Sequence, residues 1–291
     1  MMYRIVHRTT YRYKSPVSIG DHVACLTPRN LPHHRCLRNE IQITPHAACN
    51  ERTDYFGNRL CFFTVQEPHS RLVVEARSEV VIDEDETRKN VRDCAWEGVA
   101  QSLPHDRTPA SLDAYQFVFE SPRIRPSAEF AKYAAPSFQP GRPFVEALLD
   151  LTARIYKEFK FDSKATSVRT PAEEVLKKRR GVCQDFAHLQ IACLRSLNLP
   201  ARYVSGYLRT YPPPGRPRLI GADASHAWVS AYCPGLGWMD VDPTNNVVPS
   251  YNHIMLAWGR DYGDVSPLRG VIVGGRDHTL KVAVDVEPVT G

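Results

Sequence analysis

The chain has 291 residues, of which 43% are hydrophobic and 24% are charged, and its formal net charge is +5. This composition is typical of a globular protein of about two domains and excludes a disordered chain. No run of about 18 apolar residues occurs, which excludes a membrane-spanning helix. The 8 cysteines and 11 histidines are the residues whose chemistry has to be explained.

The first residues of the chain indicate in which cellular compartment the protein is expected. Residues 1–8 hold no apolar segment of the kind that a cleaved signal peptide carries, so we expect a cytoplasmic protein. Cytoplasmic thiols are kept reduced, and a chain of this length can bury a core without disulfides. We therefore expect free thiols, most of them packed in the interior.

Strands dominate residues 1–85. Apolar and polar residues alternate from Tyr3 to Lys14, which is the period of two of a half-buried strand. Further β-rich runs follow without an intervening helix, so we predict an N-terminal all-β domain, antiparallel and sandwich-like. Residues 86–142 carry an acidic run, prolines and scattered aromatics, and predict a connector with short helices.

Helical patterns come next. Apolar residues at helical spacing predict a helix over 144–159. Thr170 supplies a capping hydroxyl and Glu173 a glutamate three residues later, which together predict a helix over 170–179. A third helix is predicted over 183–197, with an apolar stripe along one face.

A strand over 201–208 and a β-hairpin over 226–242, with its turn at Pro234, complete the pattern. Together with the helices they predict an α+β core over 143–250. Two more β-like runs in the tail predict that residues 251–291 form a C-terminal β segment that packs back on the rest.

Cys183 opens the third predicted helix, directly after Gly181-Val182. Free N–H groups and the macrodipole at a helix start stabilise an anion, and the thiolate is the reactive form of cysteine. A nucleophilic thiol also needs an imidazole beside it, held by a third polar group. Cys193, by contrast, lies in mid-helix, where no backbone donor is free.

The predicted hairpin supplies both partners. If it turns symmetrically about Pro234, His226 and Asp242 face one another on neighbouring strands. Directly opposite side chains share a face of the sheet, with Cβ atoms about 5 Å apart, which suits a histidine–carboxylate hydrogen bond. A one-residue bulge would break this register. The residues therefore predict a catalytic triad of Cys183, His226 and Asp242.

Other polar residues near these positions receive structural roles. His188 follows Cys183 by five residues on one helix, about 140° around it, and so does not face the thiol. Asp185 lies in the first helical turn, where its charge suits the dipole but opposes a nearby thiolate. Asp240 shares a strand face with Asp242 and would replace it only if the register shifted.

Four blocks in the second half of the chain carry a resemblance. They are Gly181-Val182-Cys183-Gln184-Asp185-Phe186-Ala187-His188-Leu189, Pro200-Ala201-Arg202-Tyr203-Val204-Ser205-Gly206-Tyr207, His226-Ala227-Trp228-Val229 and Gly237-Trp238-Met239-Asp240-Val241-Asp242-Pro243-Thr244-Asn245. In this order they resemble the transglutaminase-like superfamily, and more narrowly the bacterial transglutaminase-like proteins described as cysteine proteases. Tyr11-Arg12-Tyr13, Leu26-Thr27-Pro28-Arg29 and residues 259–267 are similar to the terminal regions of that family.

The resemblance implies a papain-like α+β core, in which the nucleophile helix packs against an antiparallel sheet that carries the histidine and the aspartate. It implies the same triad of Cys183, His226 and Asp242. The proline-rich loop 209–225 is a candidate rim of the substrate cleft. Four further residues are candidates for the cleft itself: Gln184, Tyr207, Trp228 and Trp238. For the two tryptophans, a role in the core is an equally open alternative.

A zinc site is the alternative use of the histidines, because His22-x-x-Cys25, His33-x-x-Cys36 and His46-x-x-Cys49 place ligand-type pairs close together. Prolines interrupt this spacing and no paired Cys-x-x-Cys pattern occurs, so we expect incidental side chains, no bound metal and no cofactor. The basic run 177–180 reads as the solvated last turn of a helix beside the thiol, not as a nucleic-acid site.

Three functions remain open. The first is a thiol-dependent enzyme that acts on peptide or isopeptide-type amides through a thioester, most simply a cysteine peptidase or amidase. The second is transglutaminase-type transfer of the acyl group to an amine. The third is a non-catalytic binding module, which would more simply have lost a triad residue. The expected partner is a protein or peptide substrate, with no nucleic acid and no membrane, and the oligomeric state is left open.

Overall fold

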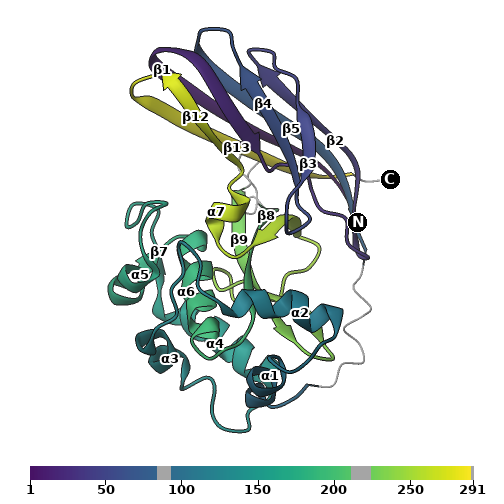
Figure 1. The fold of residues 1–291 in the computed structure, drawn as a ribbon, viewed down its shortest axis with the longest axis vertical. Coiled ribbons are helices and arrows are strands. Elements are labelled where there is room, and N and C mark those ends of the chain that lie inside the picture. The colour runs from purple at the N-terminus through teal and green to yellow at the C-terminus, as the bar shows by residue number, and fades with distance from the viewer. Residues whose placement is uncertain (84–92, 211–223, 290–291) are drawn as a thin grey trace, which may run out of the picture.

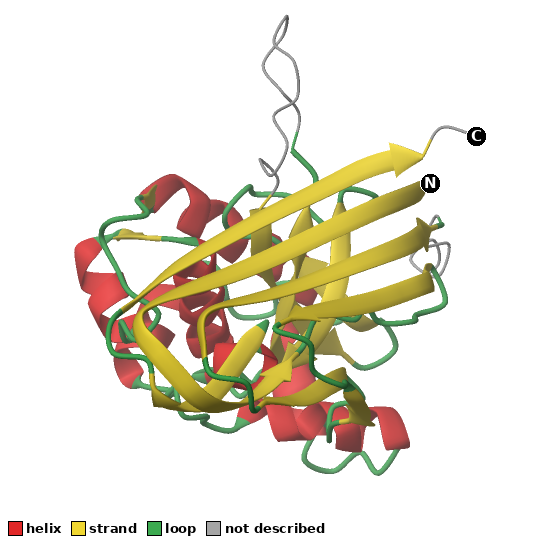
Figure 2. Cartoon of the chain, turned by 90° about the horizontal axis from the view of Figure 1, so that it is seen from above, coloured by secondary structure: helices red, strands yellow, loops and turns green. Residues whose placement is uncertain are grey.

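The computed structural model describes residues 1–83, 93–210 and 224–289 (Figure 1). A long antiparallel sheet forms one end of the molecule, and a smaller sheet with helices packed on it forms the other. Seen from above, the strands of the long sheet run across the core (Figure 2). None of the helices in these ranges is both long and apolar enough to cross a membrane. Most of the loop predicted over 209–225 lies outside the described residues.

Seven strands make up the long sheet. They are β1 (Met2–Ala24), β2 (His34–Thr44), β3 (Asn50–Thr53), β4 (Arg59–Val65), β5 (His69–Ile82), β12 (Leu268–Gly274) and β13 (His278–Val289). Their order is β2-β5-β1-β4-β3, and β12 and β13 also pair with β1. Every second residue from Tyr3 to Thr9 is buried, as the alternation in the sequence predicts. The predicted antiparallel sheet at the N-terminus is confirmed.

β1 changes partners along its length, and this explains the sandwich-like shape. Its first half pairs with β5 and β13, and its second half with β4 and β12. Both halves bury side chains in one cluster, which includes Leu72 and Val74 of β5 and Phe63 and Val65 of β4. The two layers are therefore halves of one sheet that folds over itself.

The central sheet has four antiparallel strands in the order β10-β9-β8-β11. They are β8 (Ala201–Leu208), β9 (Ala224–Cys233), β10 (Gly237–Val241) and β11 (His253–Gly259). The sequence predicts a core that ends at residue 250, which would place β11 in the C-terminal segment. In the structure, β11 pairs with β8 and is part of the central sheet. Only β12 and β13 return to the N-terminal sheet. Pairing between strands this far apart leaves no local signal in the sequence.

The helices surround the central sheet. They are α1 (Trp96–Ser102), α2 (Pro109–Tyr115), the 3-10 helix η2 (Gln116–Val118), α3 (Ala128–Ala134), α4 (Phe144–Glu158), α5 (Ala172–Lys178), α6 (Cys183–Arg195) and α7 (Tyr262–Val265). Two short parallel strands, β6 (Lys160–Phe161) after α4 and β7 (Arg180–Gly181) before α6, pair with each other. The start of α5 differs from the prediction. Thr170 Oγ1 accepts the N–H of Ser167 in the preceding loop, so it does not cap the helix.

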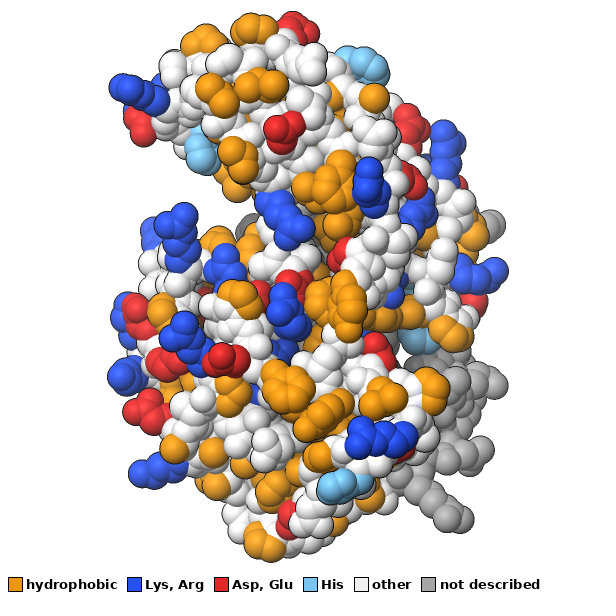
Figure 3. Space-filling view, in the orientation of Figure 1, with side chains coloured by type: hydrophobic (Ala, Val, Ile, Leu, Met, Phe, Trp, Pro, Cys, Tyr) orange, Lys and Arg blue, Asp and Glu red, His pale blue; other side chains and the backbone are white. Residues whose placement is uncertain are grey.

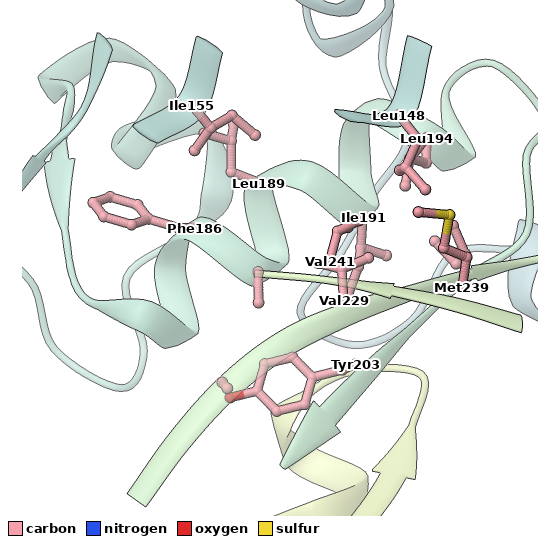
Figure 4. Close-up of a cluster of buried hydrophobic side chains, with 14 of the residues drawn as sticks. Leu148, Ile155, Phe186, Leu189, Ile191, Leu194, Tyr203, Val229, Met239 and Val241 are labelled. Carbon is pink, nitrogen blue, oxygen red and sulfur yellow. The ribbon is translucent and has the colours of Figure 1, made fainter. Parts of the chain in front are cut away.

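α6 is the centre of the core. Its apolar side chains pack between α4 and the central sheet (Figure 4). Because α6 is enclosed on these sides, its first residue is held firmly at the edge of the sheet. The packed residues include Phe186, Leu189, Ile191 and Leu194 of α6, Leu148 and Ile155 of α4, and Val229 and Val241 of the sheet.

The expectation that all cysteines are free thiols is wrong at one pair. Cys49 and Cys61 form a disulfide, with their Cα atoms 5.4 Å apart. The cause is the pairing of β3 with β4, which places Cys61 beside the start of β3. The remaining cysteines, Cys183 among them, are free. Composition and the expected compartment do not predict this disulfide, because only the pairing of β3 with β4 brings the two cysteines together.

Candidate active site

Cys183 is the first residue of α6 and is partly buried. Asp185 holds this helix start, because its carboxylate accepts the Val182 N–H at 2.8 Å and the Thr166 hydroxyl at 2.6 Å. Gly181 permits the close approach, since a Cβ there would lie 2.7 Å from the Asp185 carboxylate. The structural role predicted for Asp185 is confirmed. The thiol thus lies where backbone N–H groups have no intrahelical acceptor.

The hairpin of β9 and β10 has a register two residues away from the predicted one. Cys233 pairs with Gly237, so the hairpin is centred on Gly235 and not on Pro234. Gly235 and Gly237 have φ angles of 83° and 79°, a conformation that glycine adopts without strain, and they allow a three-residue turn. The assumption of a turn centred on the proline was wrong.

The shift leaves the predicted pair in contact, because two residues of register keep each side chain on its face of the sheet. His226 and Asp242 are diagonal neighbours, and His226 Nε2 lies 2.7 Å from Asp242 Oδ2. The same diagonal places Trp228 Nε1 3.0 Å from Asp240 Oδ2. Asp240 therefore holds the indole of Trp228 and does not replace Asp242.

Cys183, His226 and Asp242 form one hydrogen-bonded chain. The Cys183 thiol is bonded to His226, and since Asp242 takes Nε2, Nδ1 is the nitrogen left for the sulfur. Burial alone would lower the pKa of His226, but its hydrogen bonds with Asp242 and Cys183 outweigh burial and raise the pKa to about 10. Asp242 is fully buried, yet its hydrogen bonds with His226 and other donors hold its pKa well below the usual range.

Asp242 has further partners that sequence reasoning missed. His253 Nε2 lies 3.0 Å from Oδ2, Asn245 Nδ2 donates to Oδ2 at 2.7 Å, and the Thr244 N–H donates to Oδ1 at 2.9 Å. The Thr244 N–H had a signal, because an aspartate side chain in a turn commonly accepts the backbone N–H two residues on. His253 had none, since it begins β11, which reaches the site only through pairing with β8.

A cavity of about 260 Å³ lies at the thiol. The core contributes Cys183, Gln184, Tyr203 and His226, and the N-terminal sheet contributes residues that include Leu280. The cavity is thus closed by both ends of the molecule, and the surface is hollowed between them (Figure 3). Burial, together with the nearby Cys183, raises the pKa of Tyr203 well above its usual value, so its phenol stays protonated and can donate a hydrogen bond.

Among the predicted cleft residues, the structure brings Gln184 to this cavity and places the other three elsewhere. Tyr207 is buried and bonded to His7 Nδ1 at 3.0 Å. Trp228 lines a separate cavity on the other side of the triad. Trp238 packs beneath the guanidinium of a buried arginine. Large rings on a central sheet fill the core first, which is why ring size alone does not predict the cleft.

One of the three ligand-type pairs proposed for zinc, His46-x-x-Cys49, is not available, because Cys49 forms the disulfide with Cys61. Within the described part of the chain, the one group of three ligand-type side chains that comes together is His226, Asp242 and His253. Both imidazoles there are already hydrogen-bonded to the carboxylate. The three groups therefore form one hydrogen-bonded network in this structure.

The basic run at the end of α5 is held in ion pairs. Lys178 pairs with Glu174, and Arg179 Nη1 lies 2.9 Å from Glu158. On the face shown in Figure 3, Lys and Arg side chains over α5 and β7 alternate with acidic ones. This is a mixed, solvated surface.

A thiol at a helix start, an imidazole and a carboxylate on an antiparallel sheet, and a β domain that closes the site define a papain-like α+β protein. The family model of the transglutaminase-like superfamily matches residues 131–243, and the model of the bacterial transglutaminase-like N-terminal region matches residues 3–81. The chain belongs to the transglutaminase-like superfamily, with the N-terminal region of its bacterial members.

The chain is similar to several known proteins. The uncharacterized protein Rv2569c of Mycobacterium tuberculosis is 40% identical over 99% of this chain and 93% of its own length. A protein-glutamine gamma-glutamyltransferase of Pseudomonas aeruginosa is 30% identical over 38% of this chain and 19% of its own. The crystal structure of a "Putative Cysteine Protease" from Cytophaga hutchinsonii is 23% identical and covers 100% of this chain and 92% of its own, with a TM-score of 0.75, which supports the fold.

Proposed function

We propose that this protein is a thiol-dependent hydrolase of peptide or isopeptide-type amides, a cysteine peptidase or amidase. The observation that carries the proposal is the contact chain from Cys183 at the start of α6 through His226 to the buried Asp242. Nucleophile, base and orienting carboxylate are the three parts that acyl transfer through a thioester needs.

The raised pKa of His226, about 10, means that the imidazole holds its proton at neutral pH. We therefore expect a thiolate–imidazolium ion pair as the resting state. The thiolate attacks the amide carbonyl carbon, and the C–N bond breaks as His226 gives its proton to the leaving amine. This leaves a thioester on Cys183. His226 then takes a proton from water, the hydroxide attacks the thioester, and the acid and the thiolate are released.

The tetrahedral intermediates need donors for their oxyanion. The N–H of Cys183 at the helix start is one, and the protonated Tyr203 hydroxyl, which lines the same cavity, is our candidate for the second. Tyr203→Phe keeps the ring and removes only the hydroxyl. We expect a fall in kcat of about tenfold or more with little change in KM, measured by steady-state kinetics. An unchanged kcat would exclude Tyr203 from this role.

The test of the whole proposal is Cys183→Ala, assayed on a panel of peptides for release of the amine. We expect turnover to fall by at least about a thousandfold. The variant should still fold, because the thiol is at the edge of the core and the packed apolar side chains of α6 are unchanged. Retained turnover would contradict the mechanism.

Acyl transfer to an amine is the second candidate, and the likeness to a protein-glutamine gamma-glutamyltransferase over 38% of the chain favours it. The same thioester forms in both reactions, and only the acceptor differs. Adding a primary amine to the peptide assay separates them. Incorporation of the amine at the expense of free acid would make the protein a transferase.

A non-catalytic binding module is tested by the reactivity of Cys183. An ion-paired thiolate should react with iodoacetamide at neutral pH before the buried thiols of Cys25, Cys193 and Cys233 do. Mass spectrometry of the labelled protein identifies the site. Slow, unselective labelling would favour the binding module.

A further inference from the structure

A second recess lies beside the catalytic cavity and has no part in the chemistry above. Its volume is about 570 Å³, and it is formed by the segment before α3, by the segment before α5 and the first turn of α5, and by one residue of α6. The titratable side chains that line it are Arg123, Arg125, Arg169, Glu173 and His188. With three arginines against one glutamate, the recess is positively charged.

The guanidinium groups of Arg125 and Arg169 are available to a ligand. Both residues are exposed, and within the described part of the chain neither guanidinium has an ion-pair or hydrogen-bond partner. Arg123 is half-buried and is fixed in place, because its Nη1 donates to the Val168 carbonyl. Arginine binds carboxylates through two parallel N–H groups, so this set is suited to a carboxylate.

The floor of the recess adds a buried donor. His188 is only 3% exposed, and its Nε2 accepts the backbone N–H of Tyr262 at 3.1 Å. Burial lowers the pKa of His188 to about 3, so the ring is neutral and carries its single proton on Nδ1. That N–H has no partner among the described residues. His188 therefore adds a neutral N–H donor to a recess that three arginines also line, and such a set of donors suits an anion.

The recess is close to the nucleophile. The Val168 carbonyl accepts from Arg123 on the recess side and from Gln184 on the cavity side, and Arg123 also stacks over the ring of Tyr262, which lines the cavity. His188 follows Cys183 by five residues, a rise of about 7.5 Å along α6. An extended peptide covers this rise in two to three residues of about 3.3 Å each.

We propose that this recess binds a carboxylate of the peptide substrate, two to three residues from the amide that Cys183 attacks, and that the protein therefore selects acidic peptides. The proposal deepens the proposed function and rests on it for the identity of the ligand. The carboxylate can belong to an aspartate or glutamate side chain or to the carboxyl terminus of the peptide.

Binding of labelled peptides to the Cys183→Ala protein, followed by fluorescence anisotropy, tests the recess without turnover. One set of peptides moves a single glutamate along the sequence, with glutamine as its neutral match. A second set compares a free carboxyl terminus with its amide. We expect about five- to tenfold tighter binding for a carboxylate at one position, and a preference that weakens as salt is raised. The two sets show which carboxylate is bound.

Variants then assign the preference to the recess. Arg125→Gln with Arg169→Gln should remove the preference, and Arg125→Glu with Arg169→Glu should transfer it to a lysine-containing peptide. Arg107→Gln, another exposed arginine outside the recess, is the matched control. Equal binding, or no binding, of acidic and neutral peptides would overturn the recess proposal even if turnover is present. If the protein prefers acidic peptides but does not turn them over, the proposal about the recess stands and the proposed hydrolase function is contradicted.

Discussion

At the scale of single residues, the feature that organises the site is a fully buried carboxylate with two imidazoles on one oxygen. Asp242 Oδ2 is bonded to His226 on one side and to His253 on the other, while Asn245 adds an amide donor. An isolated buried carboxylate would be costly, and these donors offset that cost and keep it ionised. The orientation of His226 depends on the whole set.

The raised pKa of His226 predicts how stability depends on pH. A group whose pKa rises on folding, here from 6.5 to about 10, stabilises the fold fully below pH 6.5 and loses that contribution as pH rises through about 10. We expect the free energy of unfolding, measured with urea, to fall by a few kcal/mol between pH 6.5 and pH 10. In Asp242→Asn the fall should be smaller. A stability that is flat over this range would contradict the ion pair.

His253 is predicted to be a positioning residue, since it touches Asp242 and not the thiol. His253→Phe keeps a ring against Trp228 but removes the donor to Oδ2. We expect about a tenfold fall in kcat. Because the hydrogen bond of His253 lowers the pKa of Asp242, the acid limb of the pH–rate profile should move to higher pH. His253→Gln, whose amide can donate, should recover part of both effects. A fall in kcat with an unmoved profile would indicate a merely structural role.

At the scale of elements, α6 and the central sheet place the groups of the triad. α6 is enclosed between α4 and the sheet, so the position of its first turn is fixed by packing. β9 and β10 carry the imidazole and the carboxylate, and β8 lies between β9 and β11. β8 therefore has to accommodate the large side chains of both neighbours.

Gly206 is the residue of β8 that makes this possible. A Cβ at this position would lie 2.2 Å from the Ile254 carbonyl and 2.5 Å from the Trp228 ring. We expect Gly206→Ala to lower the free energy of unfolding by about 3 kcal/mol or more, measured by urea denaturation. Gly98→Ala is the control, because the added methyl in α1 meets nothing within 4 Å and should be neutral or stabilising by up to about 1 kcal/mol. Equal effects would contradict this packing.

At the scale of the whole molecule, the two ends are joined beside the site. Asn58, in the turn before β4, donates to the Trp258 carbonyl at 2.8 Å and accepts its N–H at 3.1 Å. The Trp258 ring lies between the guanidinium groups of Arg29 and Arg202, at 3.4 Å and 3.6 Å from its centroid. This junction sets the height of the N-terminal sheet above the cavity.

Removing the junction should therefore affect both stability and substrate binding. Asn58 is fully buried, and Asn58→Ala leaves both backbone groups of Trp258 unpaired. We expect the free energy of unfolding to fall by about 3 kcal/mol and KM to rise, from urea denaturation and steady-state kinetics. Asn50→Ala, on the exposed strand β3, should change both by little. An unchanged KM would mean that the sheet does not set the cavity.

Prediction from the sequence succeeded where the signal is local. The start of α6 at Cys183, the strand Ala201–Leu208 and the alternation in β1 follow from capping, turn residues and side-chain periodicity. The contact between His226 and Asp242 was also predicted, although from a register two residues off. It survived because a shift of two does not change the face of a strand.

Prediction failed where residues far apart meet. His253 reaches Asp242 through the pairing of β11 with β8, and Cys49 is joined to Cys61 across the pair of β3 and β4. Tyr207 and Trp228 are buried in the core, because a central sheet buries large rings, and the half-buried Trp238 packs against Tyr232.

The sequence by itself determined the main helices and strands, the family and the contact between His226 and Asp242, because these depend on short-range patterns of charge, shape and hydrogen bonding. Tertiary structure alone decided which donors hold Asp242, which side chains close the cavity and that an arginine-lined recess lies beside it. These depend on distances between segments that are remote along the chain, and only the packed fold sets such distances.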